Sequence, residues 1–400
     1  MIDINNIPGY KASYAGILRI LCWTAFFLAL ASHFLPPITE NGPFIANTKG
    51  THIRPVVTIP EDPRFIRDDL PALKGFNIAW IGDSTSAIYP PDKTIPDANY
   101  EEVKLVPAHV LGLLEKLASR KDINIDLNLQ PGARSVESFS AVAAAIQSKP
   151  DLIVLSFNPV WTFEGYEIHK RQAHLNRASA LWAHYTESWP WLALLASPAN
   201  NLWALAAQPF KILRQSTLYK SYFTGLMPDF TKSRLPVRDM DKLQHMRSGL
   251  VFWVCIGKMG NDCPKVMQPN NTDLDNKLWY RELFKLEDVD GEGFTWWAWR
   301  NKLAILRQSG IPTLIFDEPL GDDIKQDPEA YENLKRIQDI LKDFRQKYNG
   351  TNIHIIDRIP EDIVKSATFR SDDSIHMVTE GKFDDYLAQQ IWLMMKGTKP

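Results

Sequence analysis

The chain has 400 residues, 45% of them hydrophobic, with 45 Lys and Arg against 47 Asp and Glu. This near-neutral balance argues against a nucleic-acid partner, because phosphate recognition needs a clustered excess of Lys and Arg. Three cysteines exclude a disulfide-rich scaffold, and they would need histidine to complete a structural zinc site. The sequence predicts a globular protein of one large or two medium domains. It indicates no metal or other cofactor.

The first feature along the chain is an almost uncharged apolar run over residues 20–35, preceded by Lys11 and Arg19. Such a run predicts an export or anchoring segment, and the positive charges ahead of it predict a cytoplasmic N-terminus. We expect residues 1–36 to form a cytoplasmic tip and a single-pass transmembrane helix, with the rest of the chain in the periplasm or at the cell surface. Two alternatives stay open: cleavage after Ala31, at a site with the small residues of a signal-peptidase site, and a buried core helix.

Residues 37–74 are rich in proline and charge and show no sustained periodicity, which predicts a stalk or a strap over the domain surface. The domain begins near Gly75, and five apolar runs in it have the character of strands. These runs are Phe76–Gly82, Ile123–Leu129, Leu152–Ser156, Thr313–Phe316 and Asn352–Ile356.

Four segments with helical periodicity separate or follow these strands. They are Pro107–Lys121, Ser135–Ser148, Pro328–Tyr348 and Thr379–Lys396. Strands that alternate with helices predict parallel crossovers. We therefore expect a three-layer α/β/α sandwich with a five-stranded, parallel, doubly wound sheet, formed by residues 75–160 and 304–400.

Residues 161–303 interrupt the alternation and predict a large helical insertion with nine tryptophans between Trp182 and Trp299. Its most apolar part, residues 189–207, is broken by Pro198, so it is a poor membrane span. Two interpretations stay open: the insertion lies on a membrane or a partner, or it forms a lid on its own domain. Outside the cytoplasm, Cys255 and Cys263 would close a short disulfide loop; the alternative is two free thiols.

Polar residues follow the strands of the predicted sheet. A Gly-Asp-Ser sequence ending in Ser84 follows the first strand, Gly132 follows the second, Asn158 follows the third, and Asp373 and His376 precede the last helix. We expect them at one edge, because ligands bind beyond the carboxyl ends of parallel strands. An Asp beside a His can fix the tautomer of the imidazole, so that the imidazole accepts the proton of a serine hydroxyl. With N–H donors that stabilise an oxyanion, this set of residues predicts acyl transfer.

Each of these residues also has a structural interpretation. Ser84 could cap a helix, Asn158 could satisfy the loop backbone, and His376 could be a solvated loop residue. Asp83 is expected to support the turn. Three other carboxylates at the same edge could replace Asp373 as the partner of the histidine, namely Asp317, Glu318 and Asp357.

With these motifs the chain resembles the SGNH hydrolase superfamily, also called GDSL-type esterases. The matching positions are Gly82-Asp83-Ser84, Gly132, Asn158, and Asp373 with His376, over residues 75–158 and 310–395. The resemblance implies that Ser84 is the nucleophile, His376 the base and Asp373 its orienting carboxylate. It also implies an oxyanion hole formed by the backbone N–H groups of Ser84 and Gly132 and the amide of Asn158.

Two positions depart from the family pattern: Thr85 replaces the usual leucine, and Ser156-Phe-Asn158-Pro159 replaces Gly-x-Asn-Asp. The apolar N-terminal run, the Ser-x-x-Pro-x-Trp sequence over residues 156–161 and the Trp-rich insertion are similar to membrane-anchored members of bacterial envelope acylation. Examples are the D-alanyl transfer protein of teichoic acid modification and the alginate O-acetylation proteins.

This finer resemblance implies a membrane-anchored, extracytoplasmic serine esterase or O-acyltransferase that acts through an acyl-serine intermediate. Its substrate would be an acylated envelope glycan or polymer, and its partners would be membrane lipid and a membrane-bound O-acyltransferase. Two alternatives remain: a non-catalytic binding or scaffold subunit of an acyltransferase complex, and a lipase whose insertion is an interfacial lid.

Overall fold

The computed structural model of the chain describes residues 14–34, 52–56, 73–88, 103–129, 135–159, 293–322, 324–370 and 375–397. Four features predicted from the sequence lie outside these residues: Gly132, Asp373, the Cys255–Cys263 disulfide, and the insertion up to residue 292.

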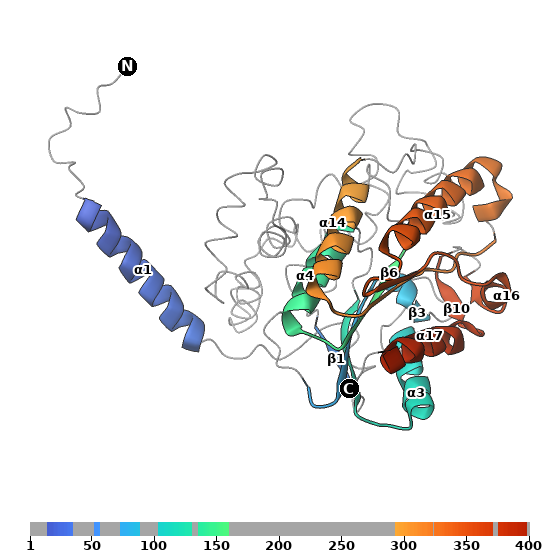
Figure 1. Ribbon diagram of the computed structural model, residues 1–400, viewed down its shortest axis with the longest axis horizontal. Helices are drawn as coiled ribbons and strands as arrows, with labels where there is room; N and C mark the ends of the chain where they lie inside the picture. Colours follow the sequence, from blue (N-terminus) through green and yellow to red (C-terminus); the bar gives the residue numbers. More distant parts are fainter. Residues whose placement is uncertain are drawn as a thin grey trace, which may run out of the picture.

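A parallel sheet of six strands forms the centre of the fold (Figure 1). In spatial order the strands are β1 (Ile53–Pro55), β5 (Ile123–Leu129), β2 (Phe76–Gly82), β6 (Leu152–Phe157), β7 (Thr313–Asp317) and β8 (Ile353–Ile356). Central β2 places Trp80 opposite Leu127 on one side and Val154 on the other. The prediction of an α/β fold with a parallel sheet is confirmed.

The sheet has one strand more than the five predicted. The extra strand, β1, comes from the segment expected to be a stalk or strap, and its Ile53 is in register with Ile125 of β5. A strand of three residues is too short to show periodicity, so the sequence did not reveal it. Pro55 fits there because β1 is an edge strand, where a missing N–H is tolerated.

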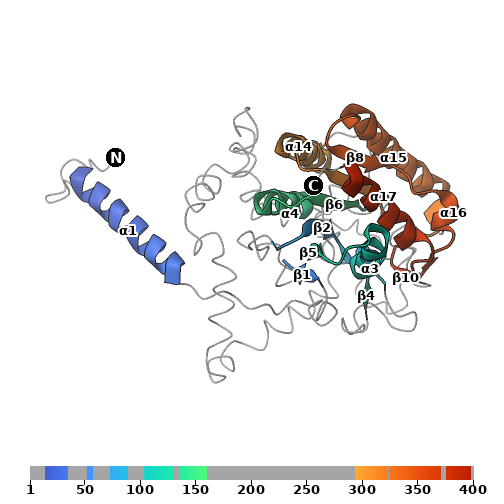
Figure 2. The ribbon, with the colours of Figure 1, turned by 60° about the horizontal axis from the view of Figure 1, so that its bottom comes forward.

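Helices cover both faces of the sheet, which makes three layers (Figures 1 and 2). Ala79 and Ile81 of β2 face one apolar core, and the alternate residues Ile78 and Trp80 face the other. The first core is completed by α4 (Ser135–Ser148), α14 (Gly293–Ser309) and α15 (Pro328–Tyr348). The second is completed by α3 (Val106–Ala118) and α17 (Phe383–Gly397).

The chain reverses its direction of winding next to β2. From β2 it passes through α3 to β5, then returns through α4 on the opposite face to β6, on the other side of β2. Without β1, the strands therefore stand in the order 2-1-3-4-5 by appearance. Doubly wound sheets bind ligands where this reversal occurs, beyond the carboxyl ends of the strands. Here that place lies after β2 and β6.

Helix α14 begins at Gly293, in a segment that the sequence assigned to the end of the insertion. Its Trp296 and Trp299 are buried in the first core, with ring centroids 6.3 Å and 4.8 Å from that of Phe157. These two tryptophans therefore belong to the sandwich, and they support the end of β6 just before Asn158.

A second, small sheet lies beside the sandwich and was not predicted. Its strands, in spatial order, are β4 (Lys104–Leu105), β3 (Ala87–Ile88), β10 (Met377–Thr379) and β9 (Thr368–Phe369). Strand β10 takes the first residue of the segment predicted as the last helix, and α17 starts at Phe383 instead of Thr379. The domain also contains three short helical turns: η3 (Ser84–Ser86), η9 (Ile324–Gln326) and α16 (Glu361–Val364).

The prediction of a transmembrane helix at the N-terminus is not supported. Helix α1 covers Tyr14–Phe34, but within the described residues no helix is both long and apolar enough to cross a membrane. Helix α1 includes Arg19 near its start and Ser32 and His33 near its end, so its uninterrupted apolar portion is short.

Candidate active site

Ser84 and His376 meet at the carboxyl end of the central strand. Ser84 is the first residue of the turn η3, just after β2, and His376 directly precedes β10. The two segments meet because β10 pairs in parallel with β3, which follows η3, with Met377 opposite Ile88. His376 Nε2 lies 2.9 Å from Ser84 Oγ, a hydrogen-bond distance.

Both residues of this pair are buried: Ser84 is 7% exposed and His376 is 3% exposed. The alternative interpretation of His376 as a solvated loop residue is therefore wrong. When Nδ1 carries the imidazole proton, Nε2 accepts the hydrogen bond from the Ser84 hydroxyl, which is the arrangement needed for general-base activation of a serine.

Asp83 holds the turn that carries Ser84, as expected from the sequence. It is the N-cap of η3, and its Oδ1 accepts hydrogen bonds from the Thr85 backbone N–H (2.8 Å) and the Thr85 hydroxyl (2.6 Å). Burial raises the pKa of Asp83, while the hydrogen bonds from Thr85 and Asn158 and the charge of His376 oppose that rise. Ser84 is therefore not the cap itself, and its hydroxyl is directed to His376.

Asn158 follows β6 and reaches the same turn from the neighbouring strand. Its amide Nδ2 donates to Asp83 Oδ2 over 3.1 Å, and the residue is buried. The structure thus brings together Ser84, His376 and Asn158, the last through Asp83.

The three carboxylates that could replace Asp373 have other partners. Asp317 Oδ2 accepts from Gln338 over 3.2 Å, and Asp357 accepts from Arg345 over 2.7 Å. Glu318 accepts from the Ser86 hydroxyl over 3.2 Å. The structure therefore gives each of them a role other than binding His376.

A buried cluster that the sequence did not predict lies under the turn η3, which carries Ser84. The carboxyl group of Glu318 accepts a hydrogen bond from the Ser86 hydroxyl over 3.2 Å, and the nearby Ser156 hydroxyl lowers its pKa. A Cβ at Gly82 would lie 2.6 Å from Ser86 Oγ and 3.1 Å from Ser156 Oγ, so only glycine allows this approach. The available sequence signal was Glu318 at a strand end, together with a serine two residues after Ser84.

Burial also determines the protonation of this cluster. It raises the pKa of Glu318 well above its usual range, and the nearby carboxyl groups of Asp83 and Asp317 raise it further. Burial likewise raises the pKa of Asp317 to about 8. The raised pKa favours the neutral form of Glu318, which reduces the repulsion between its carboxyl group and that of Asp83.

Comparison of the chain with protein-family models and with curated proteins finds no match. A proposal of function therefore depends on the chemistry of the site. A serine hydroxyl bonded to an imidazole, at the winding reversal of a doubly wound sheet, can act as a nucleophile with a base beside it.

Proposed function

We propose that the protein is a serine esterase or O-acyltransferase of the SGNH type, with Ser84 as nucleophile and His376 as general base. The observation that carries this proposal is the 2.9 Å contact between His376 Nε2 and Ser84 Oγ in a buried site. As Oγ attacks the acyl carbonyl, Nε2 takes its proton; His376 then gives that proton to the departing alcohol, leaving acyl-Ser84. Water or an acceptor hydroxyl removes the acyl group by the same steps in reverse.

The remaining catalytic roles are part of the same proposal. Asp373 would orient His376, and the oxyanion would bind the backbone N–H groups of Ser84 and Gly132 and the amide of Asn158. An amide nitrogen carries two hydrogens, so Asn158 can donate one to Asp83 and direct the other to an oxyanion.

The proposed substrate is an acylated glycan or polymer of the cell envelope, outside the cytoplasm, with membrane lipid and a membrane-bound O-acyltransferase as partners. The support is the positively flanked apolar N-terminal run and the Trp-rich composition of residues 161–303. Within α1, Leu18, Trp23 and Phe27 are exposed, so this helix offers an apolar surface that a lipid surface or a partner would cover. A reporter fused to the C-terminus should be active outside the cytoplasm; cytoplasmic activity would contradict this location.

A fluorophosphonate probe tests the proposed chemistry, because it labels only an activated serine. We expect labelling of the purified full-length protein at Ser84, identified by peptide mass mapping. Ser84→Ala should abolish the labelling and His376→Ala should slow it strongly. Ser148→Ala, which changes a serine that bonds only a helix carbonyl, should label like the unchanged protein.

A second candidate function is a non-catalytic scaffold subunit of an acyltransferase complex. One observation favours it: the Asn158 amide, expected at the oxyanion hole, donates to Asp83 in the structure. An unlabelled Ser84 in folded protein that co-purifies with an acyltransferase would support this candidate over the enzyme.

A further inference from the structure

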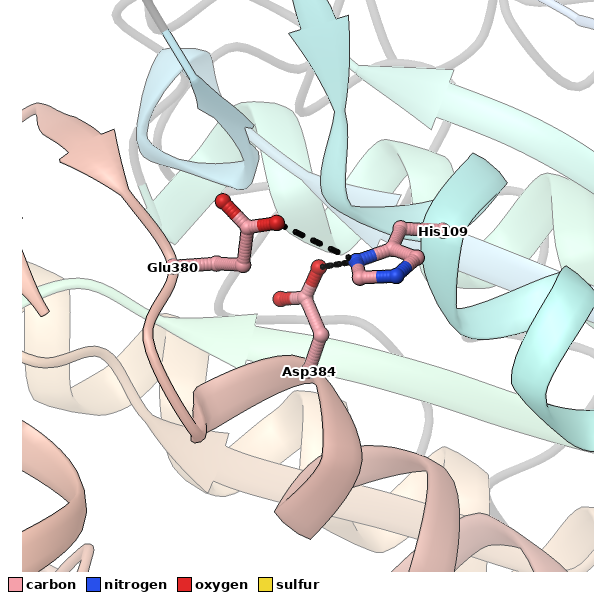
Figure 3. Close-up of side chains that lie close together, drawn as sticks. All are labelled: His109, Glu380 and Asp384. Atoms are coloured by element: carbon pink, nitrogen blue, oxygen red, sulfur yellow. Dashed lines mark hydrogen bonds and ion pairs between the residues drawn. The ribbon is translucent and has the colours of Figure 1, made fainter. Parts of the chain in front are cut away.

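Three potential metal ligands from separate elements meet beside the small sheet (Figure 3). His109 lies in the first turn of α3, Glu380 directly follows β10, and Asp384 lies in the first turn of α17. His109 Nδ1 is 2.8 Å from Asp384 Oδ2 and 3.3 Å from Glu380 Oε1, and all three ligand atoms lie within 4.8 Å of one another.

A second observation points to a ligand at this cluster. The Asp384 side chain is only 1% exposed, and its buried Oδ1 has no hydrogen-bond partner among the residues that the structure describes. Figure 3 shows both carboxylates directed to the same ring nitrogen of His109, which carries at most one hydrogen. The described protein groups therefore leave a buried carboxylate oxygen unsatisfied, and such a group is costly.

We propose that His109, Glu380 and Asp384 bind a divalent transition metal of the zinc type. A tetrahedral zinc site, with bonds of about 2.0–2.1 Å, has its ligands about 3.3 Å apart, which small side-chain movements would reach from the observed spacing. One imidazole with two carboxylates favours zinc-like ions over Mg²⁺ and Ca²⁺, which prefer oxygen ligands.

The surroundings would let the ion reach the site and would satisfy the unpartnered oxygen. The His109 side chain is 52% exposed and that of Glu380 is 27% exposed, so a fourth position is open to water. Asp384 Oδ1 could then coordinate the ion together with Oδ2, or accept a hydrogen bond from the bound water.

The backbone around Glu380 is fixed before any ion binds. Gly381 has φ +56°, and a Cβ there would lie 2.2 Å from the Ser366 carbonyl oxygen. The Lys382 N–H donates to Ser366 Oγ over 2.8 Å. A bound ion would join this turn to α3 and α17, and so would fasten the end of β10, whose start follows His376.

The test uses full-length protein treated with a chelator, desalted, and titrated with Zn²⁺ by calorimetry. We expect one equivalent to bind and the melting temperature to rise. His109→Ala and Glu380→Gln should each weaken binding at least about tenfold and abolish the rise. Glu380 is partly exposed, so its variant should fold even if an Asp384→Asn variant does not. Co²⁺ in place of zinc should give visible absorption bands that the same two variants lose.

Two matched controls separate this site from other histidines and carboxylates. His52→Ala changes a histidine that contacts the Asn124 amide, and Glu361→Gln changes an exposed glutamate paired with Lys365. Both variants should bind Zn²⁺ like the unchanged protein. The proposal is overturned if the unchanged protein binds no zinc, if His109→Ala and Glu380→Gln bind as it does, or if Mg²⁺ raises the melting temperature as much as Zn²⁺. Because the measurement is metal binding, its outcome is independent of Ser84 chemistry.

Discussion

Asp317, at the end of β7, should make the stability of the protein depend on pH. The residue is 4% exposed, its Oδ2 accepts one hydrogen bond from Gln338, and its Oδ1 has no partner within the described part of the chain. Burial raises its pKa from 3.8 to about 8. The folded protein therefore holds a proton on Asp317 that the unfolded chain releases across this range.

The sign and size of the effect follow from that difference in proton binding. The contribution of Asp317 is fully present below about pH 4 and is lost as the pH rises to about 8, because the folded state binds more protons there. Each pH unit removes about 1.4 kcal/mol, so the whole range amounts to at most about 5 to 6 kcal/mol.

The variant Asp317→Asn tests this, because its amide cannot ionise and can still accept from Gln338. Denaturant unfolding between pH 5 and 9, followed by circular dichroism, gives the free energy of unfolding of both proteins. The variant should gain about 1.4 kcal/mol per pH unit relative to the unchanged protein, levelling off near pH 8. Asp343→Asn, an exposed position on α15, is the control and should show no such gain. Parallel pH curves for Asp317→Asn and the unchanged protein would refute the reasoning.

Three further predictions concern the turn η3 and the residues that contact it. Ser84→Ala and His376→Ala should each remove most ester hydrolysis, and the double variant should be no slower than the worse single one; additive losses would contradict a shared step. Glu318→Gln should unfold at nearly the same denaturant concentration at pH 7, whereas Glu318→Leu leaves the Ser86 hydroxyl without its acceptor and should cost about 1–3 kcal/mol. Gly82→Ala should cost about 1–3 kcal/mol and slow hydrolysis, because its Cβ displaces Ser86; unchanged rates would show that the turn tolerates the movement.

Four long elements were predicted residue for residue: Phe76–Gly82, Ile123–Leu129, Ser135–Ser148 and Pro328–Tyr348. Strand β2 is apolar and buried over its last five residues, and β5 alternates apolar residues that face the second core with polar ones, which is the two-residue period of a strand. In α15, Asp327 accepts from the N–H groups of Glu329 and Ala330, and Pro328 begins the helix, which are strong local start signals.

The small sheet could not be predicted in the same way. Strands β3 and β10 have two and three residues, and each exists because of a partner distant in the sequence. No local period reveals such a strand. The last helix was expected to begin at Thr379, but Thr379 ends β10. Gly381 then takes a left-handed conformation, and helix α17 begins at Phe383.

For the site, the order of motifs at strand ends was enough to select Ser84, Asn158 and His376. The sequence could not show which partner Asp317 and Glu318 each bind. Adjacent residues at a strand end point to opposite faces of the sheet, but the sequence does not say which residue takes which face. Only the packing shows that one meets Gln338 and the other meets Ser86. The sequence also did not reveal that Ser84 and His376 are buried, since their burial depends on segments far apart in the chain.

The parallel pairing of β3 with β10 has a consequence for folding order. The contact it brings about joins residues 292 positions apart, so it closes a very long loop. A growing chain can complete β2 and η3 early, yet Ser84 has no imidazole beside it until the segment through β10 has been made and has docked. Under the proposed mechanism, the hydroxyl therefore stays an ordinary serine throughout synthesis and becomes a nucleophile only when the two ends of the domain join.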